Sequence, residues 1–329
     1  MRNLTLHAFA STKGGVGKST LAVTLARLLA NHYAKPVLIV DCDLTGTSLA
    51  DGLGLLAPQV AGWNDGKLNL SLPPTSATPH DLKTTQRLRD RRKNRPDSHE
   101  PAFVPFLNDA LDFRPVQGGP DCRIDALLWQ SEADPLLRLL PSSPLARDVE
   151  LAIAWLFNRE EPWAWVRRLA WVVDRALELI PDVSNVVFDL PPGLFGFSAL
   201  VLTLLGYINR KETLPVDFPK WNETFSCNVN PFLVTTPDRN DLYAAVDALG
   251  PLLFEVPELL PVVNREDSKE RVREVIKERF EVSGLDTLFE TVPFAAMLSQ
   301  LFRSQSSSKD LDRDSSLRDK LMRTLRVAR

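Results

Sequence analysis

The sequence predicts a doubly wound α/β fold, in which a mostly parallel sheet carries helices on both faces. An apolar run at residues 4–10 and a β-branched run at 36–40 enclose a segment whose leucines recur at helical spacing. A third apolar run, 184–189, ends in an aspartate, as the second does. Strand, helix and strand form the unit of parallel sheets, so we expect ligands beyond the carboxyl ends of these strands.

The other elements are predicted from the same periodicities, in chain order. After the first strand, Leu21, Leu25, Leu28 and Leu29 mark the first helix. Further strands are expected over residues 136–140, 231–237 and 259–265, and further helices over 148–157, 162–179 and 240–249.

Composition and charge narrow the class of protein. The chain of 329 residues is long enough for a sizeable core. Its formal charge of −3 excludes a surface coated in basic residues and leaves room for a local basic patch. The cysteines, Cys42, Cys122 and Cys227, are isolated, which fits a reducing, cytoplasmic compartment. We expect no signal peptide and no membrane span, because the apolar run at 197–208 is too short to cross a bilayer.

The segment from residue 10 to residue 20 has the residue types that wrap a backbone around phosphate groups. Glycines can adopt positive φ and let main-chain N–H groups approach an anion, and the following helix offers its positive end to the same charge. Lys18 is expected to reach the outer phosphates, Ser19 to place a hydroxyl on Mg²⁺, and Thr20 to bind an inner phosphate. The predicted nucleotide contacts are Gly14, Gly15, Val16, Gly17, Lys18, Ser19 and Thr20. The alternative, a glycine-rich turn without a ligand, is disfavoured by the flanking strand and helix.

This loop deviates from the common phosphate-binding pattern, because Thr12 stands where a glycine is usual, six places before Lys18. The run from Lys13 to Ser19 resembles the signature of the ParA/MinD family of P-loop ATPases, in which an extra lysine begins the loop. The resemblance covers residues 1–56, 136–206 and 231–304. It implies ATP and Mg²⁺ as ligands, slow and partner-stimulated hydrolysis to ADP and phosphate, and an ATP-dependent homodimer in which Lys13 reaches the partner's phosphates.

Aspartates follow two of the predicted strands. Asp41 and Asp43 end the second strand, and a pair in this Asp-x-Asp form is difficult to explain as turn caps. Asp189 opens an Asp-x-Pro-Pro-Gly motif that resembles the family's second metal-side element. The resemblance implies that Asp41 and Asp189 join Ser19 around Mg²⁺, and that Asp43 positions the attacking water.

The base of the nucleotide is expected near the end of the chain. Asn264 ends a predicted strand, and the resemblance implies that it reads the adenine amino edge with Arg265 beside it. A turn-forming Asn at a strand end is the alternative. Pro293 and Phe294 resemble the loop that closes over the base.

Three segments do not fit the regular pattern within the single P-loop ATPase domain predicted for residues 1–329. Residues 57–135 are interpreted as an insertion atypical of the family, 207–230 as a smaller second insertion, and 305–329 as a basic C-terminal helix. The basic run at 87–95 is either a solvated surface or a contact to a phosphate backbone or an acidic partner. For the C-terminal helix we favour packing or nucleic-acid contact over a membrane.

Aromatic residues gather in the middle third of the chain. Packing in the core is favoured over a base-stacking platform for Trp129, Trp155, Trp163, Trp165 and Trp171.

Two functions follow from these observations. The first is a partitioning or positioning ATPase whose nucleotide state controls attachment to duplex DNA or to a protein cargo or activator. The alternative is a nucleotide-locked adaptor whose insertion grips a protein partner, with turnover incidental. Lys13 counts against an amide-forming enzyme of the same superfamily, the unpaired cysteines against an iron–sulfur carrier, and the scattered tyrosines against a tyrosine kinase.

Overall fold

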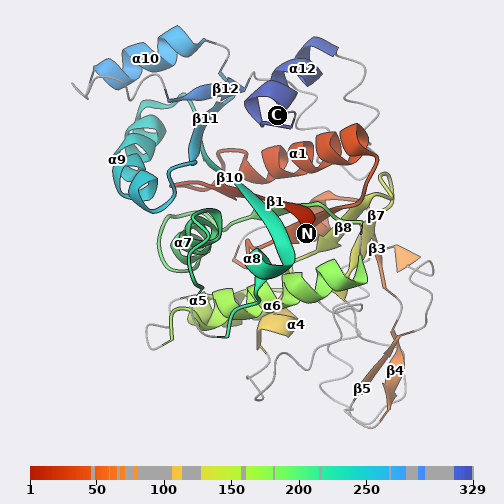
Figure 1. Cartoon of the computed structure of the whole chain (residues 1–329). Helices are drawn as coiled ribbons and strands as arrows, with labels where there is room; N and C mark the ends of the chain where they lie inside the picture. Colours follow the sequence, from red (N-terminus) through yellow and green to blue (C-terminus); the bar gives the residue numbers. More distant parts are fainter. Residues whose placement is uncertain are drawn as a thin grey trace.

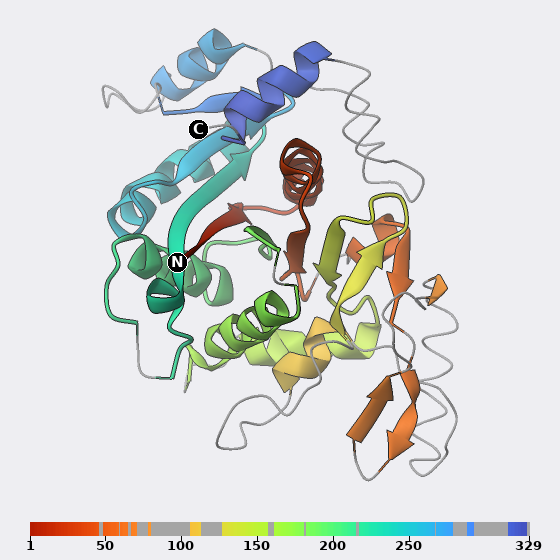
Figure 2. The ribbon, with the colours of Figure 1, turned by 45° about the vertical axis from the view of Figure 1, so that its right-hand side comes forward.

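The computed structural model describes residues 1–45, 49–58, 60–64, 67–70, 78–79, 106–112, 127–156, 161–180, 182–214, 217–266, 268–278, 288–292 and 315–327. At its centre is a ten-stranded sheet with helices on both faces (Figures 1 and 2). The strands in order across it are β12 (Glu290–Val292), β11 (Leu260–Asn264), β10 (Phe225–Thr235), β1 (Arg2–Ala10), β9 (Asn185–Asp189), β2 (Val37–Asp41), β8 (Leu137–Leu140), β7 (Trp129–Ser131), β3 (Leu55–Ala57) and β6 (Thr78–Pro79).

The strands from β12 to β8 pair in parallel, and those from β8 to β6 pair antiparallel. The central strands β2 and β9 are buried along their whole length, which explains their continuous apolar runs. The predicted doubly wound, mostly parallel fold is therefore confirmed.

The helices divide between the two faces. The apolar core on one face includes residues of α1 (Lys18–Tyr33), α2 (Leu49–Gly52) and α12 (Ser315–Thr324). The other face is covered by α4 (Leu107–Asp112), α5 (Ala146–Leu156), α6 (Ala164–Leu179), α7 (Phe197–Asn209), α8 (Trp221–Thr224), α9 (Arg239–Glu255) and α10 (Lys269–Lys277). Within the described ranges, no helix combines the length and apolar character needed to cross a bilayer.

The predicted insertion 57–135 contributes to the main sheet. No strand–helix alternation can be read from the sequence there, but β6, β7 and α4 lie inside it, with a separate hairpin of β4 (Val60–Asn64) and β5 (Lys67–Leu70). Elements of two to six residues have too few positions to show a clear periodicity, so the sequence pattern does not reveal them. The basic run 87–95 lies outside the described residues.

The irregular stretch predicted over 207–230 is shorter in the structure. Helix α7 continues to Asn209, and β10 begins at Phe225, where its first residues pair with the start of β1. The segment between them is held to α6: Trp221 Nε1 donates to Asp174 Oδ1 at 2.9 Å, and Trp171 Nε1 donates to the Asp217 carbonyl at 2.7 Å.

The tryptophans that the structure describes pack against protein. Trp129 is fully buried beside Phe106, and Trp163 meets the ring of Phe218 edge-on. The side chain of Trp155 lies outside the described set. These contacts agree with the packing interpretation.

Candidate functional site

The phosphate-binding loop connects the end of β1 to the start of α1. Gly15 and Gly17 have φ angles of +79° and +86°, a region of backbone conformation that residues with a side chain rarely adopt. Gly14 does not have a positive φ. A Cβ on Gly17 would lie 2.2 Å from Asn264 Nδ2. The loop therefore needs glycine at 15 for its backbone angle, and at 17 for both its angle and its close packing.

Lys18 is buried at the point where this loop meets β9. Its Nζ lies 2.7 Å from Asp189 Oδ1, and the two side chains are 6% and 1% exposed. Burial by itself lowers the pKa of Lys18, but the charges of Asp189, Asp43 and Asp41 outweigh it and raise that pKa. The side chain is therefore a fixed positive charge among three carboxylates.

Asp41 and Asp189 lie side by side, because β2 and β9 pair in a register that places them opposite one another. Asp41 Oδ2 accepts the Leu49 N–H at 2.9 Å and the Ser142 hydroxyl at 2.8 Å. Burial, together with repulsion from Asp189, raises the pKa of Asp41 to about 7. The hydrogen bonds from Ser142 and Leu49 therefore do not offset the burial of Asp41 and its repulsion from Asp189.

These residues fit a divalent cation. Asp189 Oδ2 is buried and has no hydrogen-bond partner within the described part of the chain. Mg²⁺ is typically held by one or two carboxylates together with substrate phosphates, and Ser19 lies in the adjoining first turn of α1. Among the described residues, no group of three or more His, Cys, Asp or Glu side chains could hold a metal ion. In a Mg²⁺ site of this kind, phosphates of the nucleotide would share the ion with the carboxylates.

Asp43 lies two residues beyond Asp41 and is half-buried. The Asp43 N–H donates to Asp41 Oδ1 at 3.3 Å, and the Thr45 hydroxyl donates to Asp43 Oδ1 at 3.5 Å. It is thus less enclosed than Asp41. Thr20, in the first turn of α1, is also half-buried.

Lys13, at the start of the loop, points away from Lys18 and pairs with a different helix. Its Nζ is 2.7 Å from Asp241 Oδ1 in the first turn of α9, and the Lys13 side chain is 47% exposed. Asp241 also accepts the Thr236 hydroxyl at 2.7 Å. Burial works to raise the pKa of Asp241, but the hydrogen bonds from Lys13 and Thr236 outweigh it and lower that pKa. Sequence reasoning missed Asp241, because an acidic residue in the first turn of a helix is common.

The predicted base site is described in part. Asn264 is 5% exposed, and its Nδ2 donates to the Val16 carbonyl at 2.8 Å, so in this structure it fastens the phosphate-binding loop. Arg265 beside it has a φ of 68°. Pro293 and Phe294 lie outside the described residues.

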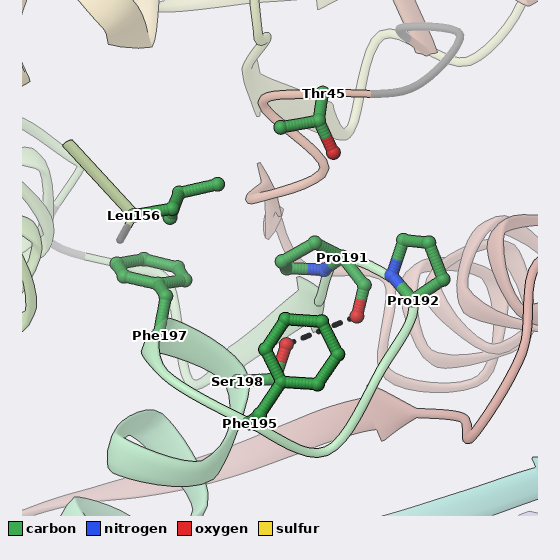
Figure 3. A pocket seen from close by; sticks show the side chains of 7 residues that line it. All are labelled: Thr45, Leu156, Pro191, Pro192, Phe195, Phe197 and Ser198. Carbon is green, nitrogen blue, oxygen red and sulfur yellow. Dashed lines mark hydrogen bonds between the residues drawn. The ribbon is translucent and has the colours of Figure 1, made fainter. Parts of the chain in front are cut away.

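A small apolar hollow lies between the loop after Asp43 and the loop after Asp189 (Figure 3). Its walls are formed by Thr45, Leu156, Pro191, Pro192, Phe195, Phe197 and Ser198. The Ser198 hydroxyl donates to the Pro191 carbonyl at 3.0 Å, which closes the turn between β9 and α7. A Cβ on Gly193 would lie 2.4 Å from Phe195, so this turn also needs its glycine.

Comparison with known proteins identifies the chain. The family model described as the CobQ/CobB/MinD/ParA nucleotide binding domain matches residues 7–301. The chain belongs to this family. The family resemblance that the loop predicted is therefore confirmed, and the family is one of nucleotide-binding domains.

Solved structures share the fold of this CobQ/CobB/MinD/ParA family member at low sequence identity. A ParA family ATPase from Chlorobium tepidum TLS is 16% identical, with a TM-score of 0.50 and coverage of 97% of both chains. Apo McdA from Cyanthece is 15% identical, with a TM-score of 0.54 and coverage of 99% of both. The MinD cell division protein of Aquifex aeolicus is 16% identical, with a TM-score of 0.50, over 98% of this chain and 95% of that one.

Curated relatives match over a segment. Cytosolic Fe-S cluster assembly factor NUBP1 homologs of Caenorhabditis briggsae and Caenorhabditis elegans are each 42% identical over 64 residues, which is 20% of this chain and 20% of each relative. The chain thus matches about a fifth of the length of these relatives.

Proposed function

We propose that this protein is a ParA/MinD-type ATPase that dimerises when it binds ATP and hydrolyses ATP slowly with Mg²⁺. The observation that carries the proposal is the contrast between the two lysines of one loop. Lys18 is 6% exposed and bound to Asp189, whereas Lys13 is 47% exposed and points away to Asp241. One lysine is suited to the phosphates of its own subunit, and the other is accessible to a second subunit.

The chain's own residues would act by position and charge. Lys18 and the N–H groups of the loop bind the phosphates, while Ser19, Asp41 and Asp189 would hold Mg²⁺, which supplies charge neutralisation when bound. Asp43, less buried than Asp41, accepts a hydrogen bond from the attacking water. Catalysis of this kind needs no covalent intermediate.

Light-scattering masses with each nucleotide test the switch. Asp43→Ala is expected to slow hydrolysis and form a long-lived dimer with ATP, because the water loses its acceptor. Lys13→Ala is expected to bind ATP and stay monomeric, and neither variant should dimerise with ADP. Arg239→Ala, which removes an exposed surface pair with Glu278, serves as the control for an altered charge near α9. An ATP-independent oligomer, or a Lys13→Ala variant that dimerises normally, would refute the switch.

Duplex DNA is the cargo that we propose first. Helix α12 buries Leu317 and Leu321 against the core, so its apolar side is used for packing. On its other side, Lys320 and Arg323 line an open hollow together with Lys269 at the start of α10. Glu290 lies in the same hollow and pairs with Lys269 at 2.6 Å, so the net charge there is positive.

The DNA proposal predicts a steep dependence on salt. ATP-loaded protein should shift duplex DNA at low ionic strength and release it as salt rises, and Lys320→Ala with Arg323→Ala should reduce the salt slope. If ATP-loaded protein fails to shift DNA at low ionic strength, a protein partner becomes the leading cargo. Steady-state phosphate release with and without DNA then separates an active switch from an adaptor whose turnover is incidental.

A further inference from the structure

We propose that Asn108 and Ser142 are positioning residues for Asp41, so that α4, which lies within the predicted insertion 57–135, helps to shape the metal site. The inference rests on the proposed Mg²⁺-dependent ATP binding. It begins with the attachment of α4 to the core. Leu107, Ala110 and Leu111 are fully buried in the same apolar cluster as strands β1 and β9. The α4 helix is thus a fixed part of the domain, beside α6 (Figure 1).

Two hydrogen bonds from α4 enclose the loop that follows β8. The Leu107 N–H donates to the Pro141 carbonyl at 2.8 Å. Asn108 Oδ1 accepts the Ser143 N–H at 2.7 Å. These bonds hold the residues immediately before and after Ser142, so the position of Ser142 depends on α4.

Asn108 is placed for this contact and for nothing else that the structure describes. Its side chain is 2% exposed, and its Nδ2 has no hydrogen-bond partner among the described residues. Burying an amide with half of its capacity unused is costly. The bond to the Ser143 N–H is therefore the contact that accounts for a polar side chain at this point of the core.

Ser142 in turn holds one oxygen of Asp41. Its hydroxyl lies 2.8 Å from Asp41 Oδ2, and its N–H donates to the same oxygen at 3.3 Å. The Leu49 N–H occupies Oδ2 as well, at 2.9 Å. The other oxygen, Oδ1, accepts the longer 3.3 Å bond from the Asp43 N–H. Ser142 thus helps to fix the rotation of the Asp41 carboxylate.

The loop is also tied on its far side, to α5. The Ser143 hydroxyl donates to Asp148 Oδ2 at 2.5 Å and accepts the Leu145 N–H at 3.3 Å, which anchors it to the start of α5. Between this anchor and α4, the peptide of Ser142 and Ser143 is the link to Asp41. Asp41 is therefore positioned through one peptide unit that is held between α4 and α5.

Metal affinity measured separately from nucleotide affinity tests the proposal. The variants are Ser142→Ala, which removes the hydroxyl, and Asn108→Leu, which removes the acceptor but keeps the branched shape and the number of side-chain heavy atoms. Ser142→Thr keeps the hydroxyl and should behave as a rescue. Ser131→Ala is the matched control, because Ser131 is a buried serine whose hydroxyl accepts a backbone N–H away from Asp41.

Binding of a fluorescent ATP analogue is measured with EDTA and in a Mg²⁺ titration, and Mn²⁺ paramagnetic resonance reports the metal directly. Ser142→Ala and Asn108→Leu should raise the Mg²⁺ concentration for half-saturation about 10- to 100-fold, as losing the partner of a metal ligand commonly does. Affinity in EDTA should change less than about twofold, and Ser142→Thr should lie near the wild type.

Two outcomes would overturn the proposal. One is an unchanged Mg²⁺ requirement in Ser142→Ala, which removes only one oxygen atom and carries the test if Asn108→Leu fails to fold. The other is an equal loss of affinity with and without Mg²⁺, which would indicate general disruption. A wild type that binds Mg²⁺ and ATP but never dimerises would instead refute the proposed function and leave this result standing.

Discussion

The charge of Asp41 should lower the free energy of unfolding of the nucleotide-free protein, and Asp41→Asn should raise it again. Burial and the neighbouring Asp189 raise the pKa of Asp41 from 3.8 to about 7. Each pKa unit corresponds to about 1.4 kcal/mol, so ionising Asp41 in the folded state costs about 4 kcal/mol relative to the unfolded chain. The side chain is 1% exposed, so solvent does not screen this cost appreciably.

The sign of the effect follows from proton uptake. Between pH 3.8 and about 7 the folded state holds a proton on Asp41 that the unfolded state has lost, so stability falls as pH rises through this window. His7 acts in the opposite direction. Burial lowers the pKa of His7 from 6.5 to about 4, although a hydrogen bond with Asn185 works to raise it. The contribution of His7 to folding stability therefore rises with pH between those two values.

The assay is urea unfolding from pH 4 to pH 8, with chelator and without nucleotide. Because His7 is present in both proteins, the difference in the free energy of unfolding between wild type and Asp41→Asn reports the effect of Asp41 alone. That difference should change by about 4 kcal/mol across the range, with Asp41→Asn the more stable at pH 8. Asp182→Asn, on an exposed turn, is the control. If this difference stays constant to within about 1 kcal/mol across the pH range, neither burial nor Asp189 shifts the pKa of Asp41.

Three further predictions concern the loop and its helix. Lys18→Ala should abolish ATP binding in isothermal titration, because the phosphates lose their main side-chain counter-charge; unchanged affinity would refute the site assignment. Gly17→Ala should lower both thermal stability and ATP affinity, because its φ of +86° disfavours a side chain and its Cβ would meet Asn264 at 2.2 Å. Gly250→Ala in α9 is the control and should leave ATP affinity unchanged. Arg27→Met should cost about 3–5 kcal/mol in urea unfolding, because Arg27 Nε lies 2.8 Å from Asp134 Oδ2 and the two side chains are 1% and 6% exposed. The double variant with Asp134→Leu should recover most of that loss, and a single variant that costs under about 1 kcal/mol would contradict a stabilising buried pair.

The sequence by itself determined the nucleotide-binding loop, the family and the carboxylates at two strand ends. These features are local: the loop between β1 and α1 is one contiguous run, and Asp41 and Asp189 each end a strand whose apolar residues are consecutive. The parallel sheet followed from the same units. Whether each residue performs its assigned role stays a prediction.

The tertiary structure alone decided which distant residues complete the site. Asp241 lies 228 positions from Lys13 in the sequence, and Ser142 lies 101 positions from Asp41. Asn108 comes from a segment in which no periodicity was visible, and β7, β3 and β6 are too short to show one. Such contacts depend on which strands become neighbours and in what register. That choice is set by burial across the whole sheet, and no local run of residues records it.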